Sequence, residues 1–368
     1  MRDATPSSPT VRRGPADPAG LNLRHHGDDE LAPGLVDLAV NVRPGGPPPW
    51  LRRVLADTLT GLSEYPRPHA AREAVAARHH RRPTDVLITA GAAEAFTLIA
   101  RAFRFRHPVV IHPQFTEPEL VLRTAGHPVD RVLLSAVDGF ALPDGALPPT
   151  ADLVVVGNPT NPTSTLHAAR ALAALARPGR LLLVDEAFMD VVPGETESLA
   201  GAAEIPGLIV VRSLTKMWGL AGLRVGYLLA APEIITALAA VQPHWSVSTP
   251  ALAAAVACSS PAAVAEAQVA AARVTVDRAY LLECLAAFDG VEVIGLPSAP
   301  FVLLRVRDGD TIRRRLRDCG FAVRRGDSFP GLGPDWLRLA VRDPHTTDAF
   351  CAALATVQLE AMVSGGPA

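Results

Sequence analysis

The sequence predicts an α/β protein with a large domain built on a mostly parallel central sheet and a small α+β domain. Between residues 86 and 230, apolar runs alternate with helical patterns of about ten residues, an order typical of parallel sheets. The run at 153–157 has no polar side chain, as expected of a strand buried on both faces. After residue 232, long Ala-rich segments precede a second series of short strands, which predicts the small domain.

The large domain is expected to follow a regular order along the chain. An apolar run at 35–40 leads into a Pro/Gly-rich loop, and helical patterns follow at 50–62 and 69–82. We expect strands at 86–89, 109–112, 129–134, 153–158, 180–186, 208–213 and 224–230. We expect the intervening helices at 93–103, 116–126 and 167–176.

The small domain is expected to combine Ala-rich helices with short strands. We expect helices at 232–241, 249–258, 261–288, 309–319 and 345–358, and strands at 291–295, 301–306, 321–325 and 336–341. In the last strand, Leu337, Leu339 and Val341 share one apolar face, because side chains alternate along a strand. Arg338 is therefore turned away from the small-domain core, either to solvent or to the cleft between the domains.

The chain divides into four expected segments. Residues 1–20 are rich in Pro, Ser and Gly without periodicity, which predicts a flexible arm. Residues 21–42 are expected to pack near the active site. The large domain is expected over 43–245 and the small domain over 246–368.

Composition excludes several classes of protein. The net charge of −2 argues against a dedicated nucleic-acid binder, which carries a basic excess. The four cysteines form no CxxC pair, so we expect free thiols in a reducing compartment and no metal site. No apolar run reaches the roughly 18 residues of a membrane span, and no signal peptide is recognisable. We therefore expect a cytoplasmic protein without membrane or nucleic-acid partners.

The sharpest compositional feature is a single lysine. Lys216 is the only lysine in the chain, and all other residues in the Lys+Arg total of 35 are arginine. An arginine stays protonated, whereas a lysine amine can lose its proton and attack a carbonyl. Lys216 is thus either a chance surface residue or a position where arginine cannot perform the chemistry.

Polar residues follow the apolar strands near this lysine. Asn158 and Asn161 lie in GNPTNPTS, Asp185 ends an apolar run, and Arg224 comes eight residues after Lys216. In open α/β sheets, ligands bind at the carboxyl ends of the strands. A magnesium site at Asp185-Glu186 is an alternative, but the chain has no GxxxxGK[ST] phosphate loop. A lysine, a carboxylate, an amide and an arginine together fit pyridoxal 5′-phosphate (PLP).

These motifs resemble those of a known family. GNPTNPTS, VDEAF, RSLTKMWGLAGLRVGY and FPGLGPDWLRLAVR resemble the fold-type-I PLP-dependent enzymes of aminotransferase class I/II. The resemblance covers about residues 22–360. It is strongest to histidinol-phosphate aminotransferases and to the threonine-phosphate decarboxylases of the cobalamin pathway.

The resemblance implies roles around the cofactor ring. Lys216 forms the Schiff base with PLP and then moves the proton, and Asp185 pairs with the pyridine nitrogen. Asn161 holds the phenolate oxygen, and Phe115 stacks on the ring. Phe188 departs from the family, whose usual tyrosine at this position also bonds the phenolate oxygen, so reactivity is expected to differ.

The resemblance also implies how the cofactor phosphate is held. Ser213 and Arg224 bind it, Thr215 assists, and the backbone amides of Ala92 and Ala93 contribute from a helix start. Tyr65 reaches the phosphate of the other subunit's cofactor, which implies a homodimer with shared active sites.

The expected substrate is a phosphorylated small molecule. By resemblance, Arg324 and Arg338 bind its anionic groups, and Arg325 could share the phosphate. Asn41 and His26 are expected near the substrate. The bond at the α-carbon that stands perpendicular to the PLP ring is the one that breaks, so the residues around the carboxylate decide the reaction.

The reaction itself remains open between related chemistries. The motif at 26–28, His-Gly-Asp, resembles the HGG-like motif of the decarboxylases, although its second glycine is missing. It favours L-threonine-O-3-phosphate decarboxylase over the alternative, a histidinol-phosphate-type aminotransferase that uses 2-oxoglutarate. A third possibility is a non-catalytic protein of the same fold that binds a partner, but the presence of Lys216 and Asp185 argues against it.

Overall fold

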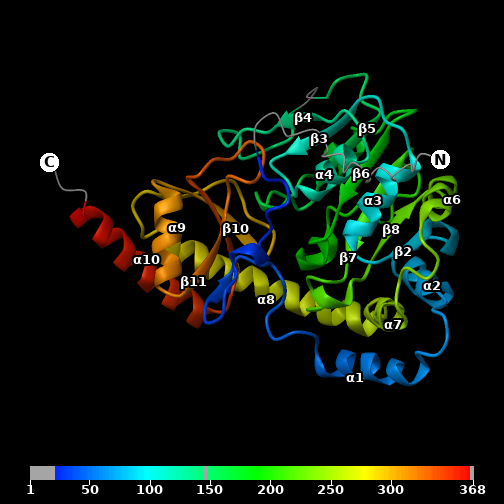
Figure 1. Ribbon diagram of the computed structural model, residues 1–368, viewed down its shortest axis with the longest axis horizontal. Helices are drawn as coiled ribbons and strands as arrows, with labels where there is room; N and C mark the ends of the chain where they lie inside the picture. The colour runs from blue at the N-terminus through cyan, green and yellow to red at the C-terminus, as the bar shows by residue number, and fades with distance from the viewer. Residues whose placement is uncertain (1–20, 144–146, 365–368) are drawn as a thin grey trace, which may run out of the picture.

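The computed structural model describes residues 21–143 and 147–364, so the arm expected at 1–20 lies outside the described residues. Figure 1 shows two bodies, with strands β2 to β8 in one and the elements α9, α10, β10 and β11 in the other. The long helix α8 (Pro261–Leu285) runs along both bodies, and the N-terminal segment passes between them. This arrangement is the predicted α/β architecture.

The large sheet has the order β2-β8-β7-β6-β5-β3-β4. Its strands are β2 (Val86–Thr89), β8 (Gly226–Ala230), β7 (Leu208–Ser213), β6 (Leu181–Asp185), β5 (Leu153–Gly157), β3 (Pro108–His112) and β4 (Asp130–Leu133). Strand β8 runs antiparallel to both of its neighbours, and the central strands are parallel. The carboxyl ends of β5, β6 and β7 therefore meet at one edge.

Two helical layers cover this sheet. Along β5, Val154 and Val156 belong to one buried cluster, whereas Leu153 and Val155 belong to another. The first layer contains α1 (Pro49–Asp57), α2 (His69–Arg78), α5 (Ala169–Ala173) and α7 (Thr249–Cys258), and the second contains α3 (Ala92–Ala102), α4 (Glu117–Thr124) and α6 (Pro232–Val241). Burial on both faces explains why β5 has no polar side chain.

The small sheet has the order β1-β11-β12-β10-β9. Its strands are β1 (Val36–Leu38), β11 (Phe321–Arg325), β12 (Trp336–Ala340), β10 (Phe301–Val306) and β9 (Val291–Val293). Leu337, Leu339 and Val341 lie in its core, as the alternation predicted. Strand β1 pairs parallel with β11, which ties the N-terminal segment to this domain.

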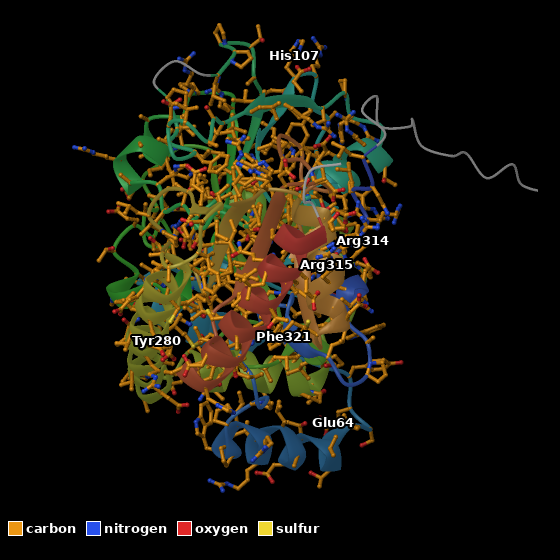
Figure 2. The ribbon with its side chains drawn as sticks, turned by 90° about the vertical axis from the view of Figure 1, so that its left-hand side faces the viewer. Glu64, His107, Tyr280, Arg314, Arg315 and Phe321 are labelled. Carbon is orange, nitrogen blue, oxygen red and sulfur yellow. The ribbon has the colours of Figure 1, made fainter. Side chains whose placement is uncertain are left out.

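Two helices close the far side of the small domain, α9 (Gly309–Asp318) and α10 (Pro344–Ser364). In Figure 2, α10 lies in front of Phe321, whose ring packs edge-on against Phe350 at 5.7 Å between centroids. Tyr280 of α8 donates a hydrogen bond to Asp348 Oδ1 at 2.6 Å. The ring contact joins β11 to α10, and the hydrogen bond joins α8 to α10, so the small domain is anchored to the helix that continues into the large one.

The two domains share α7 and α8 as a connection. Ala251 and Ala255 of α7 pack in the cluster of the large sheet, and so do Ala263 and Ala267 of α8. The second half of α8, with Leu281 and Leu285, belongs to the small-domain cluster. In packing terms, the large domain therefore extends past residue 245 into α8.

No single helix among the described residues is long and apolar enough to cross a membrane. The pair α7 and α8 meets the criteria of length and composition only when taken together, with a bend of 75° between them.

Candidate active site

A cavity opens at the carboxyl ends of the central strands. It is bounded by the start of α3, the loop after β3, the ends of β5, β6 and β7, and the turn before β8. Its lining includes Ala92, Ala93, Gln114, Phe115, Asn161, Asp185, Phe188, Ser213, Thr215, Lys216 and Arg224. Every residue expected at the cofactor except Tyr65 thus lies around one cavity.

Asp185 and Lys216 face this cavity from neighbouring strand ends. Asp185 closes β6, and its Oδ1 accepts a hydrogen bond from the Ala187 backbone N–H at 3.0 Å. Burial raises the pKa of Asp185 to about 6, although the Ala187 amide and Lys216 act in the opposite direction. Burial, followed by Arg338 and Arg224, lowers the pKa of Lys216 to about 8. A fraction of the Lys216 amine is therefore neutral and nucleophilic near neutral pH.

The start of α3 forms a site for an anion. Gly91 caps this helix with φ +81° and no side chain, so the first amides of α3 are open toward the cavity. A Cβ on Gly91 would lie 2.6 Å from Arg224 Nη2. Glycine at this position therefore lets the Arg224 guanidinium lie across the helix start. Ser213 and Thr215, whose hydroxyls are 2.7 Å apart, complete the cradle.

Asn161 and Arg338 connect this cavity with the small domain. Arg338 Nη1 donates to Asn161 Oδ1 at 2.5 Å, and Nη2 donates to the Ala39 carbonyl. Its Nε has no hydrogen-bond partner, and within the described residues no carboxylate pairs with it. Burial, together with Arg324, holds the pKa of Arg338 well below its usual range. A buried cation without a counter-ion is a ready partner for an anionic ligand.

Two phenylalanines lie beside the cavity. Phe115 lies against His26, with 5.5 Å between ring centroids, and faces the cavity from the loop after β3. The buried Phe188 packs edge-on against Phe301 at 5.0 Å, and Lys216 Nζ lies 5.7 Å from the Phe188 centroid. Phe188 thus supplies an apolar wall next to the lysine in place of a hydroxyl.

A second cavity adjoins the first and opens toward the N-terminal segment. The residues expected near the substrate, His26, Asn41, Arg324 and Arg338, all line it, as do Lys216 and Asp28. The Oδ1 of Asn41 is buried and has no partner. Arg324 Nη2 donates to the His25 carbonyl at 2.8 Å and to Ser328 Oγ at 2.6 Å, so protein groups hold much of its guanidinium.

Three residues considered for the site lie elsewhere. Asn158 is turned away and bonds the backbone of His167. Arg325 forms a fork with Asp327 and does not line either cavity. Tyr65 is 70% exposed and stacks on Trp245 at 4.3 Å, outside the cavity of its own chain.

The structure adds residues that the sequence did not single out. Gln114 lines the cofactor cavity beside Phe115, and its Nε2 donates to the Val155 carbonyl at 3.3 Å. Phe329 lies under the Arg324 guanidinium, 4.7 Å from ring centroid to Cζ. The sequence could have indicated Gln114 by its place next to Phe115, and Phe329 by its place in the FPGLG motif.

A buried charge network supports the strand ends from behind. Arg212 precedes Ser213, and its guanidinium reaches Glu186 at 2.9 Å, Asp190, and Glu195 at 2.6 Å. Glu186 follows Asp185 in the chain. The network therefore fixes the ends of two neighbouring strands. One carries the Ser213 hydroxyl next to Arg212, and the other carries the Asp185 carboxylate next to Glu186.

The donor set matches one cofactor in its chemistry. A carboxylate suits a protonated pyridine nitrogen, a partly neutral lysine suits an aldehyde, and the α3 amides with Arg224 suit a phosphate. No group of three or more His, Cys, Asp or Glu is placed for a metal ion within the described ranges. Fold and cavity together define a PLP-dependent enzyme of fold type I.

The chain belongs to the aminotransferase class I and II family, whose model matches residues 33–354. Pyridoxal 5′-phosphate is its cofactor. It is 48% identical over 322 residues, 87% of each chain, to a protein named histidinol-phosphate aminotransferase from Mycobacterium tuberculosis (strain ATCC 25618 / H37Rv). It is 30% identical to the threonine-phosphate decarboxylase of Salmonella typhimurium, over 88% of this chain and 91% of that one.

A solved structure gives the same picture of the fold. The L-threonine-O-3-phosphate decarboxylase of Porphyromonas gingivalis matches with a TM-score of 0.78 and 25% identity. The match covers 88% of this chain and 99% of that one. Of the two reactions expected from the sequence, the comparisons favour the aminotransferase, because the more similar relative carries that name.

Proposed function

We propose that the chain is a histidinol-phosphate-type aminotransferase, which moves the amino group of a phosphorylated amino compound to 2-oxoglutarate. The observation that carries this proposal is the 48% identity, across 87% of both chains, to a protein of that name. The decarboxylase predicted from the motif at 26–28 has its support at 30% identity. Substrate phosphate and acceptor carboxylate are both anions, which suits the guanidinium of Arg338, whose Nε has no hydrogen-bond partner and which forms no ion pair among the described residues.

In this proposal the cofactor is held at three points. When bound, PLP supplies an electron sink for negative charge at the substrate α-carbon. Asp185 would hold the proton on the pyridine nitrogen, and Asn161 Nδ2, which donates to no other described residue, would be available to the phenolate oxygen. Ser213, Arg224 and the α3 amides bind the phosphate, and Thr215 supports Ser213.

The proton at the α-carbon is assigned to Lys216. It lies between the cofactor cavity and the substrate cavity, and it is the only amine side chain in the protein. Its lowered pKa of about 8 suits a group that both takes and returns a proton near neutral pH. Phe188 keeps the environment of this amine apolar where relatives place a hydroxyl.

The substrate is oriented from the small domain. Arg338 offers Nε and its Nη atoms to the anionic group attached to the α-carbon, and Arg324 offers a second cationic position farther out. Asn41 presents an unpaired carbonyl oxygen to the same space. His26 and Phe115 form the wall on the side of the large domain.

The working unit in this proposal is a cytoplasmic homodimer. Tyr65 stacks on Trp245 at the surface instead of lining its own cavity. Leu59 and Leu62 are exposed nearby in the sequence, at 61% and 55%. An exposed aromatic and leucine surface suits burial against a second copy, with Tyr65 reaching the partner's cofactor phosphate.

A half-reaction distinguishes transfer from decarboxylation. PLP-loaded protein is mixed with L-glutamate alone, and the 2-oxoglutarate released is measured enzymatically. An aminotransferase releases about one equivalent for each Lys216, and subsequent addition of an acceptor restores the starting absorbance. No release, together with CO₂ formed from L-threonine-O-3-phosphate, would establish the decarboxylase instead. Lys216→Ala is the control, since it retains the cavity without the amine.

A further inference from the structure

The substrate cavity contains one carboxylate among several cations. Its charged lining groups are Lys216, Arg224, Arg324, Arg338 and Asp28. The four cations account for the anionic groups of cofactor and substrate. A carboxylate would repel those groups, so Asp28 requires a separate explanation.

Asp28 differs from its two acidic neighbours in having no structural partner. Asp29 accepts the His26 backbone N–H at 2.7 Å, and Glu30 is buried and pairs with Arg313 at 2.9 Å. Neither of them lines the cavity. The Asp28 carboxylate forms no hydrogen bond or ion pair within the described part of the chain. Of the three, Asp28 alone lines the substrate cavity, where its exposed carboxylate acts on Lys216 through its charge but forms no hydrogen bond with a described residue.

The backbone on either side of Asp28 is held firmly. A Cβ on Gly27 would lie 2.5 Å from the Ala39 carbonyl oxygen, the atom that accepts from Arg338. On the other side, the Glu30 carbonyl accepts from Arg317. The backbone just before Asp28 thus packs against the carbonyl group that accepts from Arg338, and Asp28 and Arg338 line the same cavity.

We propose that Asp28 selects substrates that carry a basic, hydrogen-bond-donating group at the end opposite their anion. This inference rests on the proposed function and names the substrate class of the same site. A molecule with a phosphate at Arg338 and an imidazole toward Asp28 satisfies both charges. An imidazole N–H donates in either protonation state, and the imidazolium form adds charge. L-Threonine-O-3-phosphate offers no such group beyond its α-amine.

The test compares two ligands that differ only in the ring. Histidinol phosphate and phenylalaninol phosphate share the amine and the phosphate, but phenyl replaces imidazole in the second. Dissociation constants are measured with PLP-loaded protein by the change in cofactor absorbance, and kcat/KM is measured in parallel. The wild type prefers histidinol phosphate. Asp28→Asn lowers this preference about tenfold, as expected for one charge-assisted hydrogen bond.

The pH dependence and a control variant separate this role from a structural one. The loss of preference in Asp28→Asn is larger at pH 6 than at pH 8, because the ligand imidazole is protonated at the lower pH. Asp29→Asn removes the same charge one residue away, outside the cavity, and leaves the preference unchanged. A wild type that prefers phenylalaninol phosphate, or an Asp28→Asn variant with an unchanged preference, would overturn the inference.

Failure of the proposed function gives a different result. If the wild type releases no 2-oxoglutarate from L-glutamate, the aminotransferase proposal fails, whereas the ratio of dissociation constants still decides the role of Asp28. If glutamate reacts but the two variants at 28 and 29 have equal preferences, only the inference about Asp28 fails.

Discussion

Because Lys216 is buried, we expect the free energy of unfolding of the cofactor-free protein to depend on pH. A pKa of about 8 in place of 10.5 corresponds to at most about 3.5 kcal/mol of penalty for holding the charged amine in the cavity. Below pH 8 the amine is protonated in both folded and unfolded chains, so the folded protein bears the whole penalty. Between pH 8 and 10.5 only the unfolded chain stays protonated, so the free energy of unfolding increases with pH.

The perturbation is Lys216→Met, which keeps the length of the side chain and removes the amine. At pH 7, cofactor-free Lys216→Met should unfold at a temperature about 5 °C higher than the wild type. This difference should shrink as the pH rises from 8 to 9.5. Differential scanning fluorimetry over that range measures both curves. Cofactor-free protein is essential, because bound PLP adds its own stabilisation.

A second variant, Lys216→Arg, tests whether loss of the amine proton causes the pH dependence of the Tm. Lys216→Arg keeps a charge that cannot be lost in this range, so its Tm should not approach that of Lys216→Met as the pH rises. If the wild type and Lys216→Met differ by the same amount at every pH, the amine does not titrate near 8. The account of an activated lysine would then be wrong.

Three further predictions concern neighbouring groups. Asp185→Asn should retain PLP but lower turnover by about a hundredfold or more, since breaking a buried ion pair costs about 3–5 kcal/mol; a near-wild-type rate in single-turnover absorbance measurements would exclude its role. Arg338→Lys keeps the charge and loses the fork, so kcat/KM should fall about 10- to 150-fold with PLP binding intact, and an unchanged kcat/KM would place Arg338 outside the substrate site. Tyr65→Phe should weaken PLP retention in a dimer of unchanged mass by light scattering, whereas a fully active monomer would contradict the shared site.

Much of the fold follows from local patterns in the sequence. The uniformly apolar run at β5 reflects burial on both faces, and the alternation in β12 places Arg338 opposite the small-domain core. Strand β1 is different, because three residues pair with β11 almost three hundred positions away. Such a pairing depends on the tertiary structure, so a local sequence pattern does not predict it.

In the candidate active site too, the sequence predicts some features, whereas others depend on the folded chain. The single lysine and the strand-end Asp185 could be predicted because chemistry restricts the residue types. The idea that Arg325 shares the phosphate was wrong, since Asp327, two residues on, pairs with it. The contrast between Asp28 and its neighbours Asp29 and Glu30 depends on which carboxylates find partners in three dimensions. Only the folded chain provides that information.

The proposed reaction transfers an amino group from a phosphorylated substrate to 2-oxoglutarate. The most direct test supplies PLP-loaded protein with histidinol phosphate labelled with ¹⁵N at the amine, together with 2-oxoglutarate, and follows the label by mass spectrometry. We expect one ¹⁵N-glutamate for each histidinol phosphate consumed, and none with Lys216→Ala. The proposal would be contradicted if no ¹⁵N appeared in glutamate and histidinol phosphate were not consumed, while the same preparation released CO₂ from L-threonine-O-3-phosphate.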